Sequence, residues 1–246
     1  MSFIVMLIIG SIGGFLSGML GIGGAIIIFP AILLIPPLLG MDTYSAYVAS
    51  GLTSSQVFFS TGTGTLKVVN QSNFSKVLLK YMGGGIFLGS VIGAITADLF
   101  SEIYVNRVYI FVAIIAFLMM VYKPKKSKNK KKMNRFLLVL LGATIGLLSG
   151  VVGAGGAFIV IPVLISIFKQ PMNIVISNSI VISFIASIAA FIIKLFQGYI
   201  PFEEGLALVL ASILITPIGV RIGHITPDVL QKWLISIIIL LSIFMI

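Results

Sequence analysis

A glycine-rich motif of the form SGxxGxGGxxxxxP occurs twice in this sequence and is the residue pattern best suited to chemistry. Its defining residues are Ser17, Gly18, Gly21, Gly23, Gly24 and Pro30 in the first copy, and Ser149, Gly150, Gly153, Gly155, Gly156 and Pro162 in the second. Glycine adopts left-handed backbone conformations and lets a ligand come close to the chain. A GxGG turn that opens a helix exposes amide N–H groups at the positive end of the helix dipole, which favours an anion site.

The same glycines also have a purely structural interpretation, because small residues spaced by four let membrane helices pack closely. We expect this packing role for Gly14, Gly18, Gly146 and Gly150. For the GxGG turns we favour the approach of a ligand, and their candidate substrate-binding residues are Gly21, Gly23, Gly24, Gly153, Gly155 and Gly156. The motif does not indicate nucleotide binding, since no strand precedes it and its flanks are apolar.

Polar residues in the third apolar segment of each half form a second group of candidates. They are Ser50, Thr53, Ser54 and Gln56 in the first half, and Asn178, Ser179 and Ser183 in the second. Hydroxyl groups in membrane helices often bond to a backbone carbonyl of their own or a neighbouring helix. Gln56 and Asn178 need a further explanation, because burying an amide without a partner is costly. Substrate contact and a structural role both stay open for these two amides.

The apolar segments lack the groups that several other functions need. All six acidic residues lie in loops or at segment ends, so neither a proton relay nor a carboxylate cation site is expected. The chain has no cysteine and a single histidine, His224, which excludes thiolate ligands and histidine clusters. We expect no catalytic residue, no metal site and no cofactor. Lys194 lies near a segment end and is expected to extend outward to the membrane boundary, so its neutralisation should change anion affinity only modestly.

The elements that position these candidates are expected to lie in lipid. Of the 246 residues, 59% are hydrophobic and 9% are charged, with a mean hydropathy of +1.22, whereas a soluble domain carries about 25% charged residues. Ten apolar segments are expected, at residues 3–20, 23–39, 44–66, 77–98, 103–122, 136–152, 154–169, 173–196, 204–223 and 229–246. The first segment has no basic n-region or small-residue cleavage site, so we expect it to be retained.

The first two segments of each half are short, rich in glycine and interrupted by proline. Two ordinary helices joined by a tight turn are one interpretation. We favour a pair of half-helices whose tips meet inside the membrane, where irregular backbone must be surrounded by protein or by a watery cavity.

An internal duplication relates the two halves of the chain. A shift of 132 residues aligns residues 14–30 with residues 146–162, and ten of these 17 positions are identical, where chance gives roughly one or two. The alignment predicts a first transmembrane repeat at residues 1–122, a Lys-rich cytoplasmic linker at 123–135 and a second transmembrane repeat at 136–246.

The distribution of charge predicts how the two repeats lie in the membrane. The linker holds eight of the 16 Lys and Arg residues and no acid, and basic loops stay in the cytoplasm. This position favours contact with anionic lipid head groups rather than nucleic acid. Both termini then lie outside, and a repeat with an odd number of crossings starts on opposite sides in its two copies. The predicted fold class is an all-α polytopic membrane protein with two inverted-topology helical repeats and broken, re-entrant glycine-rich helices.

The segments GFLSGMLGIGGAIIIFP and GLLSGVVGAGGAFIVIP, with VASGLTSS and ISNSIVIS in the third helices, resemble the sulfite exporter (TauE/SafE) family of anion transporters. The resemblance covers most of the chain except the Lys-rich linker. It implies transport of sulfite, sulfonates or related sulfur and carboxylate anions, with the glycine turns and the adjoining polar helices around the substrate. That family often has a G-T-S pattern on the third helix. This chain has Gly51, Leu52, Thr53 and Ser54 in the first half, and Asn178, Ser179 and Ile180 in the second.

We therefore predict a secondary transporter of a small anion, of the sulfite or sulfonate type, that works by alternating access near both GxGG turns. The alternatives are a transporter of a metal cation or an amino acid, and a membrane scaffold or sensor without transport. Missing mid-membrane carboxylates argue against a metal, and broken duplicated helices argue against a scaffold. The expected partners are a small anionic substrate and membrane lipids, with a homodimer left open and no nucleic acid.

Overall fold

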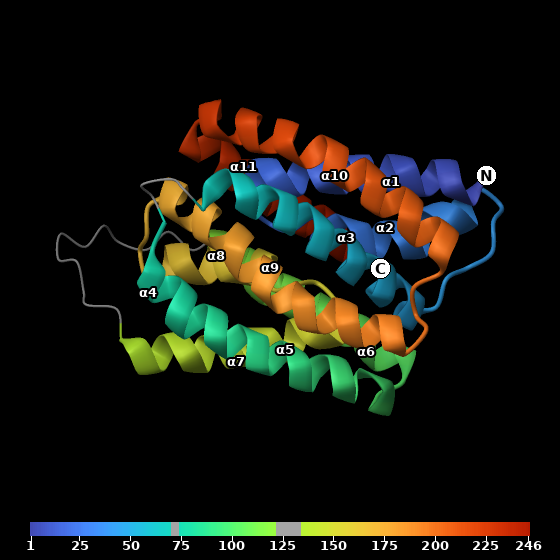
Figure 1. Ribbon diagram of the computed structural model, residues 1–246, viewed down its shortest axis with the longest axis horizontal. Coiled ribbons are helices and arrows are strands. Elements are labelled where there is room, and N and C mark those ends of the chain that lie inside the picture. Colours follow the sequence, from blue (N-terminus) through green and yellow to red (C-terminus); the bar gives the residue numbers. More distant parts are fainter. Residues whose placement is uncertain (70–73, 122–133) are drawn as a thin grey trace.

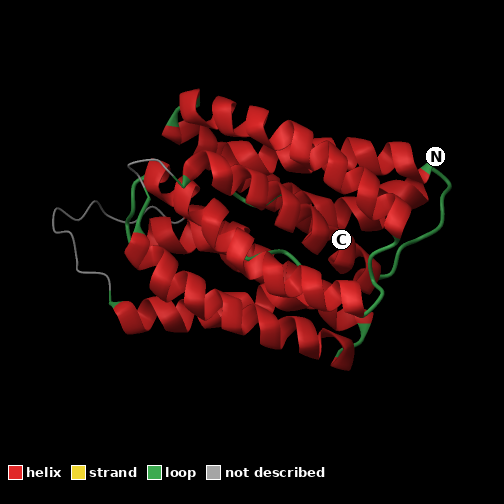
Figure 2. Ribbon diagram, in the orientation of Figure 1, coloured by secondary structure: helices red, strands yellow, loops and turns green. Residues whose placement is uncertain are grey.

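The computed structural model describes residues 1–69, 74–121 and 134–246, which are almost entirely helical and contain no strand (Figures 1 and 2). The first repeat contains α1 (Ser2–Leu20), α2 (Ala25–Leu38), α3 (Ala46–Val68), α4 (Lys76–Leu78), η1 (Leu79–Gly83), α5 (Gly84–Thr96), η2 (Ala97–Leu99) and α6 (Glu102–Val121). The second contains α7 (Arg135–Val152), α8 (Ala157–Ser166), α9 (Met172–Phe196), α10 (Phe202–Ile225) and α11 (Asp228–Phe244). Each predicted segment corresponds to one helix, or to the continuous run from α4 to η2. The predicted linker at 123–135 lies almost wholly outside the described residues.

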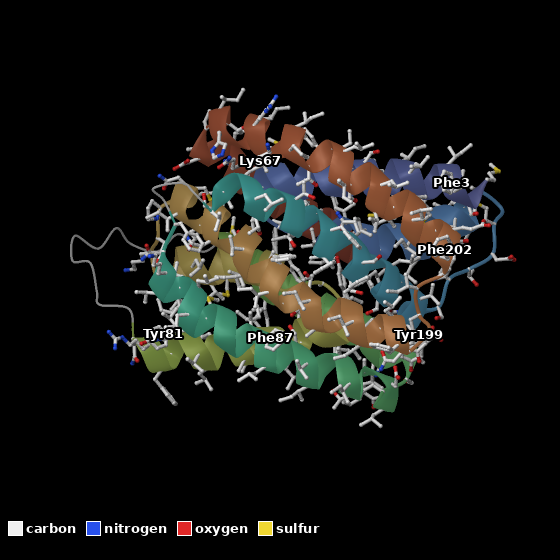
Figure 3. The ribbon with its side chains drawn as sticks, viewed as in Figure 1. Phe3, Lys67, Tyr81, Phe87, Tyr199 and Phe202 are labelled. Atoms are coloured by element: carbon white, nitrogen blue, oxygen red, sulfur yellow. The ribbon has the colours of Figure 1, made fainter. Side chains whose placement is uncertain are left out.

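The helices have the length and surface of membrane spans, as the composition predicts. Six segments are long and apolar enough to cross a bilayer: α1, the run from α4 to η2, α6, α7, α9 and α10. Large apolar side chains are exposed over the outer surface (Figure 3), including Ile8, Phe111, Leu118 and Leu214. In contrast, α3 is long enough to cross but is rich in Ser and Thr, and most of its residues are buried. The polar helix is therefore enclosed by the apolar ones.

The two ends of the helix bundle are named here after tyrosines that Figure 3 labels. Phe3, Tyr199 and Phe202 lie at one end, called the Tyr199 end, and Lys67 and Tyr81 lie at the other, called the Tyr81 end. The start of α7 also lies at the Tyr81 end, since the Arg135 guanidinium is 5.4 Å from the centre of the Tyr81 ring.

The first segment of each half is not short as predicted, because α1 and α7 are long enough to cross a bilayer, and only α2 and α8 are shorter. The two pairs, α1 with α2 and α7 with α8, enter the bundle from opposite ends (Figure 1). The pair α1 and α2 begins and ends at the Tyr199 end, where a loop leads into α3. The pair α7 and α8 begins and ends at the Tyr81 end, where the chain continues into α9. Each pair turns back within the bundle at its GxGG sequence. This is the arrangement expected of an inverted duplication with re-entrant helix pairs.

Glycines pack the first helix of each repeat against the other repeat. A Cβ built on Gly14 would lie 2.7 Å from the Cα of Ser212 in α10, and a Cβ on Gly18 would lie 2.3 Å from the backbone oxygen of Thr216. In the other pair, a Cβ on Gly146 or Gly150 would lie 2.2 or 2.5 Å from backbone oxygens of α5. Such distances leave no room for a side chain, so these four glycines have the predicted packing role.

Pro30 interrupts α2 without leaving the buried carbonyl of Ile26 unsatisfied. Pro30 has no N–H, so it cannot donate to the carbonyl of Ile26 four residues earlier. The hydroxyl of Tyr109 in α6 donates to that carbonyl at 2.5 Å, and the Tyr109 ring stacks on Phe29. A helix-breaking residue is thus accommodated by a partner from another helix, as lipid requires.

Candidate substrate site

The two GxGG sequences form matching turns, called here the first glycine turn (residues 21–24) and the second glycine turn (residues 153–156). Six glycines in them have φ between 62° and 77°, a left-handed conformation that other residues rarely adopt: Gly21, Gly23, Gly24, Gly153, Gly155 and Gly156. Gly21 and Gly153 end α1 and α7, and their N–H groups donate to the carbonyls of Ser17 and Ser149. Glycine is therefore required here by the backbone itself.

Each turn leads directly into a helix whose N-terminus carries no side-chain cap. Gly24 and Gly156 are the N-cap residues of α2 and α8, and neither has a side chain to accept from the first N–H groups of its helix. Those N–H groups and the helix dipole favour a negative charge at this position. Both turns thus lead into a helix N-terminus without a side-chain cap, and binding of an anion there stays a prediction.

Both turns lie near the middle of the bundle, on either side of Val57. A Cβ built on Gly23 would be 3.4 Å from Val57 Cγ1 and 3.5 Å from the Cβ of Ala157, at the start of α8. A Cβ on Gly155 would be 2.7 Å from Val57 Cγ1. Val57 is the central residue of α3 (Ala46–Val68). Nothing in the sequence marks this residue, because an apolar side chain in an apolar segment carries no signal.

Two of the predicted site residues hold the turns in place. The Ser179 hydroxyl in α9 donates to the carbonyl of Gly21 at 3.0 Å, and the Ser50 hydroxyl in α3 donates to the carbonyl of Val151 at 3.1 Å. Ser54 donates to the carbonyl of Gly51 in its own helix at 2.7 Å. The structure thus gives these three hydroxyls backbone partners.

Gln56 is the predicted residue whose surroundings point most clearly to a ligand. Its side chain is fully buried, yet neither Oε1 nor Nε2 has a hydrogen-bond partner. Both atoms lie 3.1 Å from the position that a Cβ on Gly24 would take, so the amide faces the N-terminus of α2. Leaving a buried polar group unpaired costs about 1–3 kcal/mol. A bound ligand at this turn would remove that cost.

The hydroxyls of Thr53 and Ser183 are likewise buried and without a partner. Thr53 lies one helical turn before Gln56 on α3. Ser183 lies beside the second glycine turn, since its backbone oxygen is 3.3 Å from the position of a Cβ on Gly155. These two hydroxyls and the Gln56 amide make a set of unpaired polar groups around the turns.

Asn178 has a different environment from Gln56. Its Oδ1 accepts from the backbone N–H of Ser75 at 2.9 Å, and its Nδ2 donates to the carbonyl of Ile174 at 2.7 Å. Both ends of this amide therefore bond to the backbone. The contact links α9 to the chain just before α4.

A cavity of about 70 Å³ lies beside the last turn of α1, at the Tyr81 end. It lies between the ends of α1, α3 and α10 and the starts of α9 and α11, and its lining includes Gly18, Met19, Ile176, Ser177, His224 and Asp228. Met19 is two residues before Gly21, and a Cβ on Gly21 would be 3.1 Å from the backbone oxygen of Ile176. The cavity thus lies close to the first glycine turn.

Lys194 does not extend outward as the sequence predicted. Its side chain is 0% exposed, and Nζ has no hydrogen-bond partner. It lies two residues before the end of α9, but Tyr199 folds back over it, with Nζ 5.7 Å from the ring centre. Within residues 1–69, 74–121 and 134–246, no group of three His, Asp or Glu residues could hold a metal ion.

Comparison with known proteins identifies the family of this chain. Residues 6–245 match the family described as "Sulfite exporter TauE/SafE". The "Probable membrane transporter protein YunE" of Bacillus subtilis is 22% identical over 231 residues, covering 85% of this chain and 84% of the relative. A "Probable membrane transporter protein" of Methanocaldococcus jannaschii is 24% identical over 262 residues, covering 98% of this chain and 94% of the relative.

No solved structure matches this chain significantly. The family match covers nearly the whole sequence, and the names of both relatives describe a transporter rather than an enzyme. The chain is therefore a multi-pass membrane transporter, and it belongs to the TauE/SafE sulfite exporter family.

Proposed function

We propose that this transporter carries a small sulfur oxyanion, such as sulfite or a small sulfonate, at a site between the first glycine turn and Gln56. The observation that supports the proposal best is the buried Gln56 amide, which lacks a partner and faces the uncapped N-terminus of α2. The backbone N–H groups of the turn and the Gln56 Nε2 donate to the anion oxygens. Gln56 Oε1 accepts a hydrogen bond from a protonated anion or from bound water.

This donor set suits an anion that must leave the site again. Backbone N–H groups and one amide stabilise a negative charge through partial charges, whereas a buried ion pair holds it through a full charge. Transport requires binding that is strong enough to replace water and weak enough to allow release. The family name and the absence of a metal-binding group in the described residues agree with an anion over a metal cation.

Alternating access fits the arrangement of the two turns. They lie on either side of Val57, at the tips of helix pairs that enter from opposite ends. A rocking motion of one pair against the other would expose the Gln56 site first to one end and then to the other. The cavity below the first turn favours access from the Tyr81 end in this conformation.

We also propose that the Tyr81 end faces the cytoplasm and that both termini lie outside. Among the described residues, basic side chains gather at the Tyr81 end: Lys67, Lys76, Lys80 and Arg135. Five of the six acidic residues lie instead at helix ends or in loops at the Tyr199 end. This asymmetry agrees with the positive-inside rule. A reporter that is active only in the cytoplasm, fused after Ile246, should be inactive, and strong reporter activity there would refute this orientation.

The substrate is tested with purified protein in liposomes. Uptake and binding are measured for sulfite, thiosulfate, taurine and sulfoacetate, with an amino acid without a sulfonate group, such as alanine, as the control. We expect saturable transport of at least one sulfur anion and none of alanine. Transport of alanine alone would favour the amino-acid alternative, and no transport of any solute would favour a scaffold or sensor.

A further inference from the structure

Lys194 is a buried cation that the central site does not use. Its side chain is 0% exposed, and Nζ has no hydrogen-bond partner. Moving an ammonium group out of water costs several kcal/mol unless another charge or a set of acceptors compensates. In a transporter for anions, a bound anion can compensate the charge of such a buried lysine.

The protein surrounds Lys194 with a cover rather than with an acceptor. The Tyr199 ring lies over Nζ at 5.7 Å and stacks on Tyr47 with the ring centres 5.3 Å apart. The Tyr47 hydroxyl donates in turn to the carbonyl of Phe100. Figure 3 places Tyr199 at the end of the bundle, so this pair of rings separates Lys194 from the outside. The buried Oε1 of Gln197, three residues after Lys194, also lacks a partner.

The charge of Asp98 acts on Lys194. The Asp98 carboxylate is, however, not in direct contact with the Lys194 ammonium group. No carboxylate oxygen in the described residues lies within 4.0 Å of Nζ. Asp98 is exposed, and together with burial it raises the pKa of Tyr199, so it also acts on the covering ring. The Nζ of Lys194 therefore has no carboxylate in direct contact among the described residues, although the charge of Asp98 acts on it from further away.

Lys194 shares one face of α9 with the residues that line the second glycine turn. Ser183, Ser187, Ala190 and Lys194 follow each other at spacings of four, three and four, which keeps them on one side of a helix. The Ser187 Cβ is 3.7 Å from the position of a Cβ on Gly155. Lys194 lies seven residues further along, about 10 Å towards the Tyr199 end. Lys194 thus lies on the same face of α9 as Ser183 and Ser187, between the second glycine turn and the Tyr199 end.

We propose that Lys194 forms a second anion-binding site at the Tyr199 end. The same small oxyanion occupies this site on its way between the outside at that end and the central site at Gln56. This inference rests on the proposed anion function. Lys194 Nζ donates to the anion, and the stacked rings of Tyr199 and Tyr47 cover it. Opening of this ring pair would connect the second site with the outside.

The test compares Lys194→Gln with Lys194→Arg, using sulfite binding to purified protein by calorimetry and sulfite uptake by liposomes. Lys194→Gln should weaken binding and raise the KM for uptake by at least about tenfold, because a full charge at a desolvated contact is lost. Lys194→Arg should restore the affinity to within about threefold. Asp98→Asn should leave the affinity unchanged or increase it, because it removes a negative charge near the site.

A structural role for Lys194 gives different results. Thermal unfolding of the anion-free proteins measures that role: a structural lysine would lower the melting temperature of Lys194→Gln and leave the sulfite affinity intact. That result would overturn the inference while Gln56→Ala still weakens binding, so the central site would stand alone. If sulfite, thiosulfate, taurine and sulfoacetate all fail to bind wild-type protein, both the anion function and the Lys194 site are wrong.

Discussion

The two glycine turns have the same backbone and different surroundings. In the first, the N-cap Gly24 faces the unpaired amide of Gln56. In the second, a Cβ on Gly156 would meet Ile86 Cδ1 at 2.8 Å and Ile145 Cγ2 at 3.0 Å, with the Ser149 hydroxyl at 3.2 Å. Both halves thus have the same turn, whereas an unpaired amide faces the N-cap glycine only at the first turn among the described residues. In our proposal the shared backbone is a scaffold, and the anion is recognised at the first turn.

The largest loss of transport is expected from substitution of the glycines that the two turns share. Gly23→Val and Gly155→Val should each abolish transport, because a branched residue in a left-handed conformation costs about 1–2 kcal/mol and its side chain would contact Val57 from either side. Uptake in liposomes and the amount of folded protein in the membrane are measured together. Transport that persists in both variants would show that the turns serve packing and not the ligand.

A smaller effect should separate the two amides. Gln56→Ala should weaken anion binding by about tenfold, or about 1.4 kcal/mol, with little loss of stability because the amide has no partner in the protein. Asn178→Ala is the matched control. It should change affinity by less than about threefold and lower the free energy of unfolding by about 1–3 kcal/mol, because the Ser75 N–H loses its acceptor.

Calorimetry gives the affinities of both variants, and thermal unfolding gives their stabilities. The sequence left the roles of the two amides open, and the structure distinguishes them. If Asn178→Ala weakened binding more than Gln56→Ala, recognition would lie in the second half.

The smallest effect is expected at the unpaired hydroxyls. Thr53→Val and Ser183→Ala each remove a buried hydroxyl without a partner, so stability should stay the same or rise slightly. Thr53→Val should weaken sulfite binding a few-fold, because Thr53 lies beside Gln56, and Ser183→Ala less than that. Titration of both purified variants with sulfite measures the difference. A larger loss for Ser183→Ala would place the anion at the second turn.

The fold could be predicted from the sequence to a large extent, because its signals are local. Glycine and proline at fixed spacings mark the turns at residues 21–24 and 153–156, and apolar length marks the helices. The candidate site was harder, since burial and pairing depend on distant residues. Gln56 and Asn178 look alike in sequence, but only Asn178 meets the backbone of Ser75. Lys194 near a helix end reads as an interfacial residue, and only the fold places Tyr199 over it.

The close packing of α1 on α10 and of α7 on α5 has a consequence for biosynthesis. Gly10, Gly14 and Gly18 of α1 have their backbone partners between Leu208 and Val220, so α10 must be synthesised before α1 can reach its final neighbour. Until then its glycine face lies against lipid or another early helix. The halves interlock in this way at both sides, which means that neither repeat can complete its core alone. The insertion of α10 therefore determines when α1 becomes fixed in place.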